Sequence, residues 1–165
     1  PPMSSPALYQ SFAAYNRAMN DAVYAVCAEI PDADRKADRG AFFKSVHGTL
    51  NHLIFGDHAW MNRFDGGDRP VLGADVPLYD DFDEMRAARG ALDDDIAAWT
   101  GTLTGEWLAE EVEWHSRIDD TMRTQPRWLL VSHMFNHQTH HRGQVTTLLT
   151  QMGYDVGVTD LTRVP

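Results

Sequence analysis

The chain has 165 residues, 43% of them hydrophobic, which is enough to fill the core of one domain. Lysine and arginine number 14 against 24 aspartate and glutamate residues, so the formal net charge is −10 with histidine neutral. Because nucleic acids and anionic membranes are bound through an excess of basic side chains, this balance argues against both as partners. We expect a single domain over residues 1–165 that acts on a small molecule.

The first predicted helix begins after Ser5 and ends before Pro31. Apolar residues recur along it at intervals of three and four, which places them on one helical face. These residues are Leu8, Phe12, Tyr15, Met19, Val23, Val26 and Ile30. Ser5 suits the N-cap and Pro6 the first helical position, whereas Pro31 cannot continue the helix.

The same helix carries Cys27, the only cysteine of the chain. A single cysteine excludes an internal disulfide and favours a reducing, cytoplasmic setting. Its apolar neighbours predict a buried thiol rather than a nucleophile. No apolar run reaches the roughly 18 to 20 residues that a membrane-spanning helix needs, so we expect a soluble protein.

A second helix is predicted from about Ala41 to Phe64, after a charged surface connection over residues 32–40. Its core-facing positions follow the helical period. They are Phe42, Val46, Leu50, Leu53, Asp57, Trp60 and Phe64. Glycines and prolines are too frequent in residues 66–80 for a helix, so we predict a long loop that acts as a lid.

A third helix is predicted to begin near Asp81, where Asp81 and Glu84 have the spacing of a capping box, and to continue to Leu103. Residues 105–124 lose the helical period and predict an irregular crossing or a short hairpin. The last predicted helix runs from Pro126 to Gly153. Four long amphipathic segments indicate an all-α fold, a four-helix bundle.

Histidine is concentrated in the last predicted helix, which carries four of the eight histidines of the chain within residues 133–141. A helical projection places His137 and His141 in the middle of its apolar face. Two imidazoles one turn apart on one face can reach the same metal ion, as they do in helical HExxH zinc sites. The three residues between them include no glutamate, which argues against a protease of that class.

The third ligand has to come from another helix, because two imidazoles one turn apart cannot surround an ion. His52 is modestly favoured, since it lies beside the apolar stripe of the second helix and next to small residues that allow a close helix approach. His47 and His58 lie on another flank together with Asn51, which we predict to be a polar surface.

Three further residues of the last helix could hold ring nitrogens of these ligands: His133, Asn136 and Gln144. His133 lies one turn before His137, so it could instead replace His137 as a ligand, contact the substrate or lie on the surface. For Asn136 and Gln144 the alternative is a bond to neighbouring backbone, and for His140 a partly exposed polar position is favoured. Arg142 points away from the apolar face on the helical projection, which predicts a structural salt bridge rather than substrate binding.

Two sequence segments carry a family resemblance. They are HGTLNHLIFGDHAWMNRF at residues 47–64 and HMFNHQTHHRGQV at residues 133–145, and they resemble the second-helix and last-helix signatures of the DinB/YfiT-like proteins. The resemblance implies a four-helix bundle in which one histidine of the second helix and a pair from the last bind a divalent metal. These positions are His52, His137 and His141. It also implies a relationship to thiol-dependent S-transferases and to a thiol-dependent maleylpyruvate isomerase, and frequent homodimers.

Three neutral imidazoles would leave a zinc or nickel ion with an open coordination position, as in catalytic sites. We therefore expect a metal-dependent enzyme, with transfer of sulfur from a low-molecular-weight thiol slightly ahead of hydrolysis. The competing hypothesis is a metal-binding or interaction protein without turnover. The sequence identifies no catalytic side chain beyond the three ligands.

Overall fold

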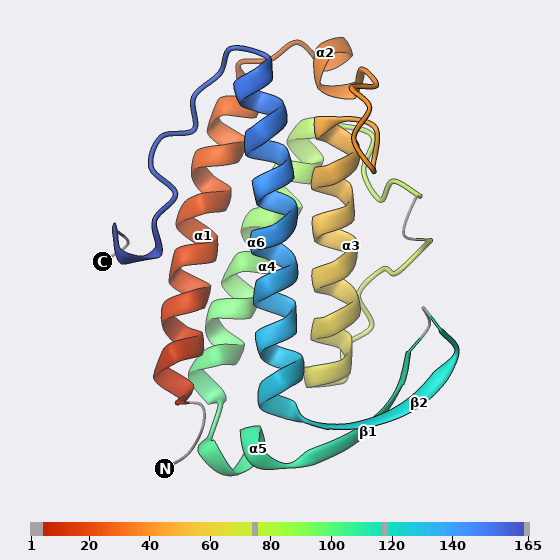
Figure 1. Ribbon diagram of the computed structural model, residues 1–165, viewed down its shortest axis with the longest axis vertical. Coiled ribbons are helices and arrows are strands. Elements are labelled where there is room, and N and C mark those ends of the chain that lie inside the picture. The colour runs from red at the N-terminus through yellow and green to blue at the C-terminus, as the bar shows by residue number, and fades with distance from the viewer. Residues whose placement is uncertain (1–4, 74–75, 117–118, 164–165) are drawn as a thin grey trace.

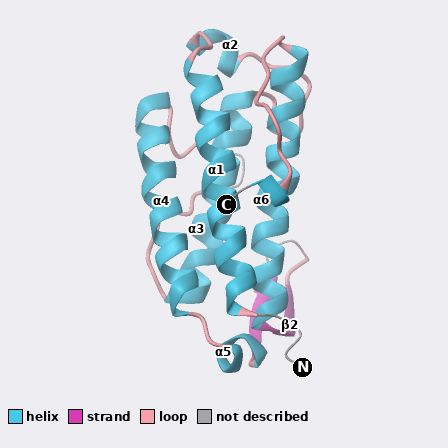
Figure 2. Cartoon of the chain, turned by 90° about the vertical axis from the view of Figure 1, so that its left-hand side faces the viewer, coloured by secondary structure: helices cyan, strands magenta, loops and turns pink. Residues whose placement is uncertain are grey.

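The computed structural model describes residues 5–73, 76–116 and 119–163, most of them helical. Its elements in chain order are α1 (Pro6–Ala28), α2 (Asp32–Lys36), α3 (Val46–Asp65), α4 (Phe82–Thr102), α5 (Gly105–Ala109), β1 (Glu111–Ser116), β2 (Thr121–Pro126), α6 (Arg127–Gln151) and the 3-10 helix η1 (Leu161–Arg163). The long helices α1, α3, α4 and α6 run side by side, with α1 packed mainly on α4 and α3 mainly on α6 (Figures 1 and 2). Among the described residues, no helix combines the length and hydropathy that crossing a membrane requires.

The helix limits follow the predicted signals except at the start of α3. This helix begins at Val46 instead of Ala41, because Ser45 is its N-cap and accepts a hydrogen bond from the Gly48 backbone N–H. Residues 41–44 form a tight turn in which Phe42 is 84% exposed, so the prediction that Phe42 faces the core is wrong. At its other end α3 stops before Gly66, which adopts the left-handed conformation.

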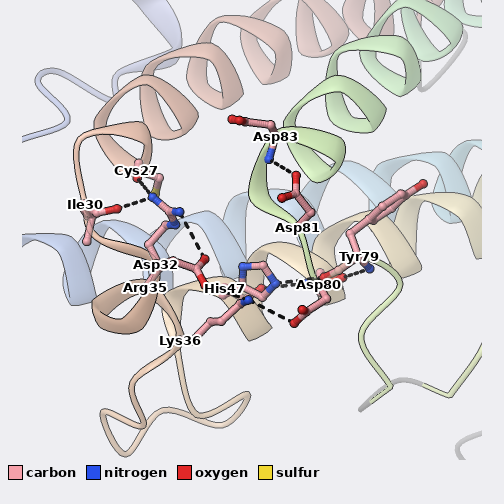
Figure 3. Close-up of polar contacts among 11 residues, drawn as sticks. Cys27, Ile30, Asp32, Arg35, Lys36, His47, Tyr79, Asp80, Asp81 and Asp83 are labelled. Carbon is pink, nitrogen blue, oxygen red and sulfur yellow. Dashed lines mark hydrogen bonds and ion pairs between the residues drawn. The ribbon is translucent and has the colours of Figure 1, made fainter.

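The connection between α1 and α3 was predicted to be a charged surface segment, but one of its charged side chains, Arg35 of α2, is buried. Its guanidinium donates to the backbone carbonyls of Cys27, at 2.9 Å, and of Ile30, which lie at the C-terminal end of α1 (Figure 3). Helix ends leave such carbonyls without partners, so Arg35 caps α1. Cys27 is buried as predicted, and burial raises the pKa of its thiol to about 12.

Residues 105–124 contain a hairpin, the second of the two predicted alternatives. β1 and β2 pair antiparallel, from Glu111 opposite Pro126 to Ser116 opposite Thr121. Trp114 on the inward face of β1 packs against Trp60 of α3, with ring centroids 5.6 Å apart. The fold is mostly helical, with a two-stranded sheet at one end of the long helices (Figure 1).

The buried face of α1 differs from the predicted apolar stripe. Leu8 is 42% exposed, whereas the polar side chains of Asn16 and Asn20 are buried. The apolar period misses this arrangement because the partners of the two asparagines are side chains on other helices.

Those partners form a buried layer of charged and amide groups across the long helices. Arg89 of α4 donates from Nη1 to Asp57 Oδ2 of α3 at 2.5 Å and from Nη2 to Asp93 Oδ1 at 2.7 Å. Asn20 donates to both carboxylate oxygens of Asp93, at 3.1 and 3.0 Å, and Asn16 to one of them at 3.2 Å. Each of these side chains is buried, so the pairing replaces the water that the charges give up on folding.

Helix α6 joins the layer through Gln138 and Arg142. Gln138 Nε2 donates to Asp57 Oδ1 at 2.9 Å, and the Arg142 guanidinium donates to Asn16 Oδ1. Arg142 is only 5% exposed and has a structural role as predicted, but its partner is an amide oxygen and not the carboxylate of a salt bridge. The positive charges of Arg89 and Arg142 thus equal in number the negative charges of Asp57 and Asp93 in the layer.

Replacing Arg89 by alanine would leave the Asp57 and Asp93 carboxylates buried without their closest positive partner. We expect this variant to lose about 3 to 5 kcal/mol of the free energy of unfolding. Arg86→Ala removes an exposed arginine from the previous turn of α4 and should change that free energy by less than about 0.5 kcal/mol. Urea unfolding followed by circular dichroism measures both variants, and equal effects would contradict this role of Arg89.

Candidate metal centre

Helices α3 and α6 bring the three predicted ligands together. Each of His52, His137 and His141 offers one ring nitrogen, and these nitrogens all lie within 4.8 Å of one another. His52 Nε2 and His137 Nε2 are 3.1 Å apart. His52 and His141 are 9% and 8% exposed, so the nitrogens converge at a largely enclosed point.

The close approach of His137 to α3 depends on Gly56, one turn after His52. A Cβ atom at Gly56 would lie 2.6 Å from His137 Cε1, closer than side-chain carbons come to other atoms. The imidazole of His137 therefore lies directly against the backbone of α3. This is the close helix contact that the small residues beside His52 predicted.

The donor set fits a divalent metal ion. Metal–imidazole bonds of about 2.0 to 2.1 Å place two nitrogens of a tetrahedral site roughly 3.3 Å apart, close to the separation of the His52 and His137 Nε2 atoms. His141 Nδ1 lies 2.8 Å from Gln144 Oε1, which accepts a hydrogen bond from the ring N–H and leaves His141 Nε2 with its lone pair for the cluster. His137 Nδ1 is buried without a hydrogen-bond partner among the described residues, and an ion held by His137 Nε2 would not supply one.

The surroundings favour the neutral, metal-binding form of the imidazoles. Burial, and then the neighbouring rings of His141 and His52, lower the pKa of His137 to about 3. Burial also lowers the pKa of His141. Both rings are thus uncharged at neutral pH, as metal ligands must be.

One side of the cluster is covered by Phe43, a residue that the sequence analysis did not identify. Its ring stacks on His52 with centroids 3.8 Å apart and meets His141 edge-on at 5.5 Å. The turn that carries Phe43 lies against α3 at Gly48, where a Cβ atom would be 2.3 Å from the Phe43 carbonyl oxygen. The sequence signal is weak: two adjacent phenylalanines precede the Ser45 cap.

The other side opens into a pocket of about 770 Å³ between α3, α6, the hairpin and the loop after α3. His52 and His137 form part of its wall. Trp60 belongs to the same wall, with ring centroids 5.6 Å from Trp114 and 5.0 Å from His133. A molecule in this pocket would lie next to the histidine cluster.

His47 and His58 do not lie on the polar surface that was predicted, because both are buried against the loop between α3 and α4. His47 Nε2 lies 2.9 Å from the Tyr79 carbonyl oxygen (Figure 3), and His58 Nδ1 lies 2.8 Å from that of Pro70. Asn51 is buried too, and bonds both the N–H and the carbonyl of Tyr79. This flank of α3 holds the described parts of the loop, whose residues 74–75 lie outside the described residues.

The remaining candidates on α6 occupy different positions. Gln144 contacts a predicted ligand directly, through His141 Nδ1. The His133 ring is 6.3 Å from that of His137 and packs edge-on against Trp60, in the wall of the pocket. Asn136 and His140 are exposed, and His140 Nε2 is 3.4 Å from Gln144 Nε2.

Gly56→Ala should displace the His137 ring and reduce the metal content of the purified protein several-fold, because the added methyl group occupies the space of the imidazole. Gly143→Ala is the matched control, since Gly143 lies on α6 close to His141 and a Cβ atom there meets nothing within 4 Å. This second variant should keep its metal. Elemental analysis of both variants after zinc loading checks the prediction, and equal metal content would contradict the close packing of His137 on Gly56.

Comparison with known proteins identifies the family of the chain. The sequence model of the DinB family matches residues 3–165. Protein DinB of Bacillus subtilis (strain 168) is 25% identical over 153 residues, which cover 88% of this chain and 87% of that protein. Both matches extend over nearly the whole chain, including the helices that carry the histidine cluster. The chain belongs to the DinB family.

Proposed function

We propose that the protein binds one divalent metal ion, zinc or nickel, through His52, His137 and His141, and uses it to transform a small molecule. The observation that carries this proposal is the convergence of the three ring nitrogens beside an open pocket of about 770 Å³. A structural ion would be enclosed by four protein ligands, whereas three ligands next to a pocket are typical of a catalytic site.

When bound, such an ion would deprotonate a thiol outright or lower the pKa of a water molecule. The chain's own residues favour the thiol. Among the described residues that line the pocket there is no aspartate or glutamate, so hydrolysis would have no carboxylate as general base. Within the described part of that wall, His133 is the only imidazole besides His52 and His137. We therefore place sulfur transfer from a low-molecular-weight thiol ahead of hydrolysis.

The histidine cluster is closed on one side by Phe43 and open on the other side to the pocket. Phe43 covers the His52 ring, which keeps that side closed to a substrate. The side toward Gly56 and Trp60 remains for the substrate and the thiol. The long loop, held by His47 and His58, contributes its residues 71–73 to the pocket wall.

We further infer that the four long helices form the four-helix bundle of DinB/YfiT-like proteins. The support is their pairwise packing, α1 with α4 and α3 with α6, with further contacts of α1 with α6 and of α3 with α4. The homodimer and the cytoplasmic location implied at the outset stay predictions. The rival function is metal binding without turnover, which only thiol-dependent turnover in the experiment below would exclude.

Replacement of each ligand by alanine tests the donor set. His52→Ala, His137→Ala and His141→Ala should each lower the metal content sharply, because two imidazoles hold an ion far less tightly than three. His140→Ala removes an exposed ring from the same helix and should keep the metal. Elemental analysis gives the metal content, and an undiminished value for His137→Ala would contradict the assignment.

Cobalt substitution tests sulfur transfer. Glutathione, bacillithiol or mycothiol added to the cobalt protein should produce sulfur-to-metal charge-transfer absorption in the ultraviolet, because the thiol binds as a thiolate. S-methylglutathione has no thiol and serves as the control. If none of the three thiols changes the spectrum or supports turnover, sulfur transfer is rejected, and hydrolysis and passive metal binding remain.

A further inference from the structure

The pocket beside the histidine cluster has a mainly apolar wall built from several elements. α3 contributes Phe55 and Trp60, β1 contributes Trp114, and α6 contributes Leu129 and Leu130. The indole of Trp60 is close to that of Trp114, so the two aromatic side chains form a continuous surface. Such a wall binds a bulky apolar or aromatic group through burial of its surface.

The formal charges in this wall have one sign. Arg63 of α3 and Arg123 of β2 are the only arginines or lysines among the described lining residues, and no aspartate or glutamate is among them. The chain as a whole has a net charge of −10. An acidic protein thus has a pocket wall with two positive groups, which favours a negatively charged ligand.

Both guanidinium groups are held at the pocket by other contacts. Arg63 donates from Nη1 to the Ala59 carbonyl oxygen at 2.7 Å, and its guanidinium lies 5.0 Å from the centre of the Trp60 ring. Arg123 pairs with Asp119 and donates from Nε to Thr121 Oγ1 at 3.3 Å. A guanidinium has five N–H donors, so it can bind an anion while it keeps a backbone or hydroxyl partner.

Asp119 does not cancel the charge of Arg123 inside the pocket. The side chains of Arg123 and Asp119 are 45% and 41% exposed, and an ion pair so open to water contributes little. Asp119 is also not among the described lining residues. A ligand anion can therefore bind Arg123 from the pocket side.

We propose that this pocket selects an organic anion whose apolar or aromatic part packs on Trp60 and Trp114 while its negative group is bound by Arg63 and Arg123. The inference rests on the proposed function in one respect: the pocket is taken as the binding site of the substrate. It concerns the substrate and not the thiol, because the wall around the two tryptophans is apolar.

The test compares two probes of similar shape on the zinc-loaded protein. Naphthalene-2-sulfonate carries a negative charge and is a weak metal ligand, and 2-(methylsulfonyl)naphthalene is its neutral counterpart. We expect the sulfonate to bind about tenfold more tightly by calorimetry at low ionic strength, a difference that charge-assisted hydrogen bonds supply. The preference should shrink at about 1 M salt, where the Debye length is about 3 Å.

Variants locate the binding. The double variant Arg63→Gln, Arg123→Gln should bind both probes equally, whereas Arg86→Gln, on the exposed face of α4, should keep the preference. Ala59→Leu fills part of the pocket without changing its charge and should weaken the binding of both probes.

Three results would overturn the proposal: equal binding of both probes to the unaltered protein, a sulfonate preference that survives the double arginine replacement, and tighter arginine-dependent binding of S-methylglutathione than of the sulfonate. The metal content of each variant is measured in parallel. If the unaltered protein holds its metal but binds both probes equally, this inference alone is rejected, whereas absence of metal from the unaltered protein rejects the proposed function.

Discussion

The hydrogen bond from Gln138 Nε2 to Asp57 Oδ1 joins α6 to α3 at the level of the histidine cluster. Asp57 is the residue after Gly56, and Gln138 is the residue after His137. The bond between Asp57 and Gln138 therefore holds α3 and α6 in the register at which the His137 ring packs on Gly56. Arg89 holds the other oxygen of Asp57, which extends the constraint to α4. Because these groups are buried, a shift of either helix would leave a charge or an amide without a partner.

The buried polar layer fixes the geometry of the histidine cluster, whereas three less regular segments determine how accessible the cluster is. The turn before α3 places Phe43 on one side of the histidines, and the loop after α3 and the hairpin build the pocket on the other. The long helices thus fix the distances between the ring nitrogens. The connecting segments decide which molecules reach them, as is usual where loops surround a rigid scaffold.

Features that depend on local patterns could be predicted from the sequence, such as the limits of α4 and α6 and the pairing of His137 with His141 on one helical face. Features that depend on contacts between distant segments could not. The helical period counts apolar residues, so it missed the burial of Arg142 by a partner on another helix. His47 is buried by a loop whose path no local pattern specifies. Phe43 was missed for the same reason, since its role is to stack on the ring of His52, which lies further along the chain.

X-ray absorption spectroscopy of the zinc-loaded protein tests the central claim that three imidazoles hold the ion. The account predicts three histidine nitrogens at about 2.0 to 2.1 Å, with any further ligand supplied by solvent or thiol. A spectrum with fewer than three imidazole nitrogens, or one dominated by carboxylate oxygens, would contradict it.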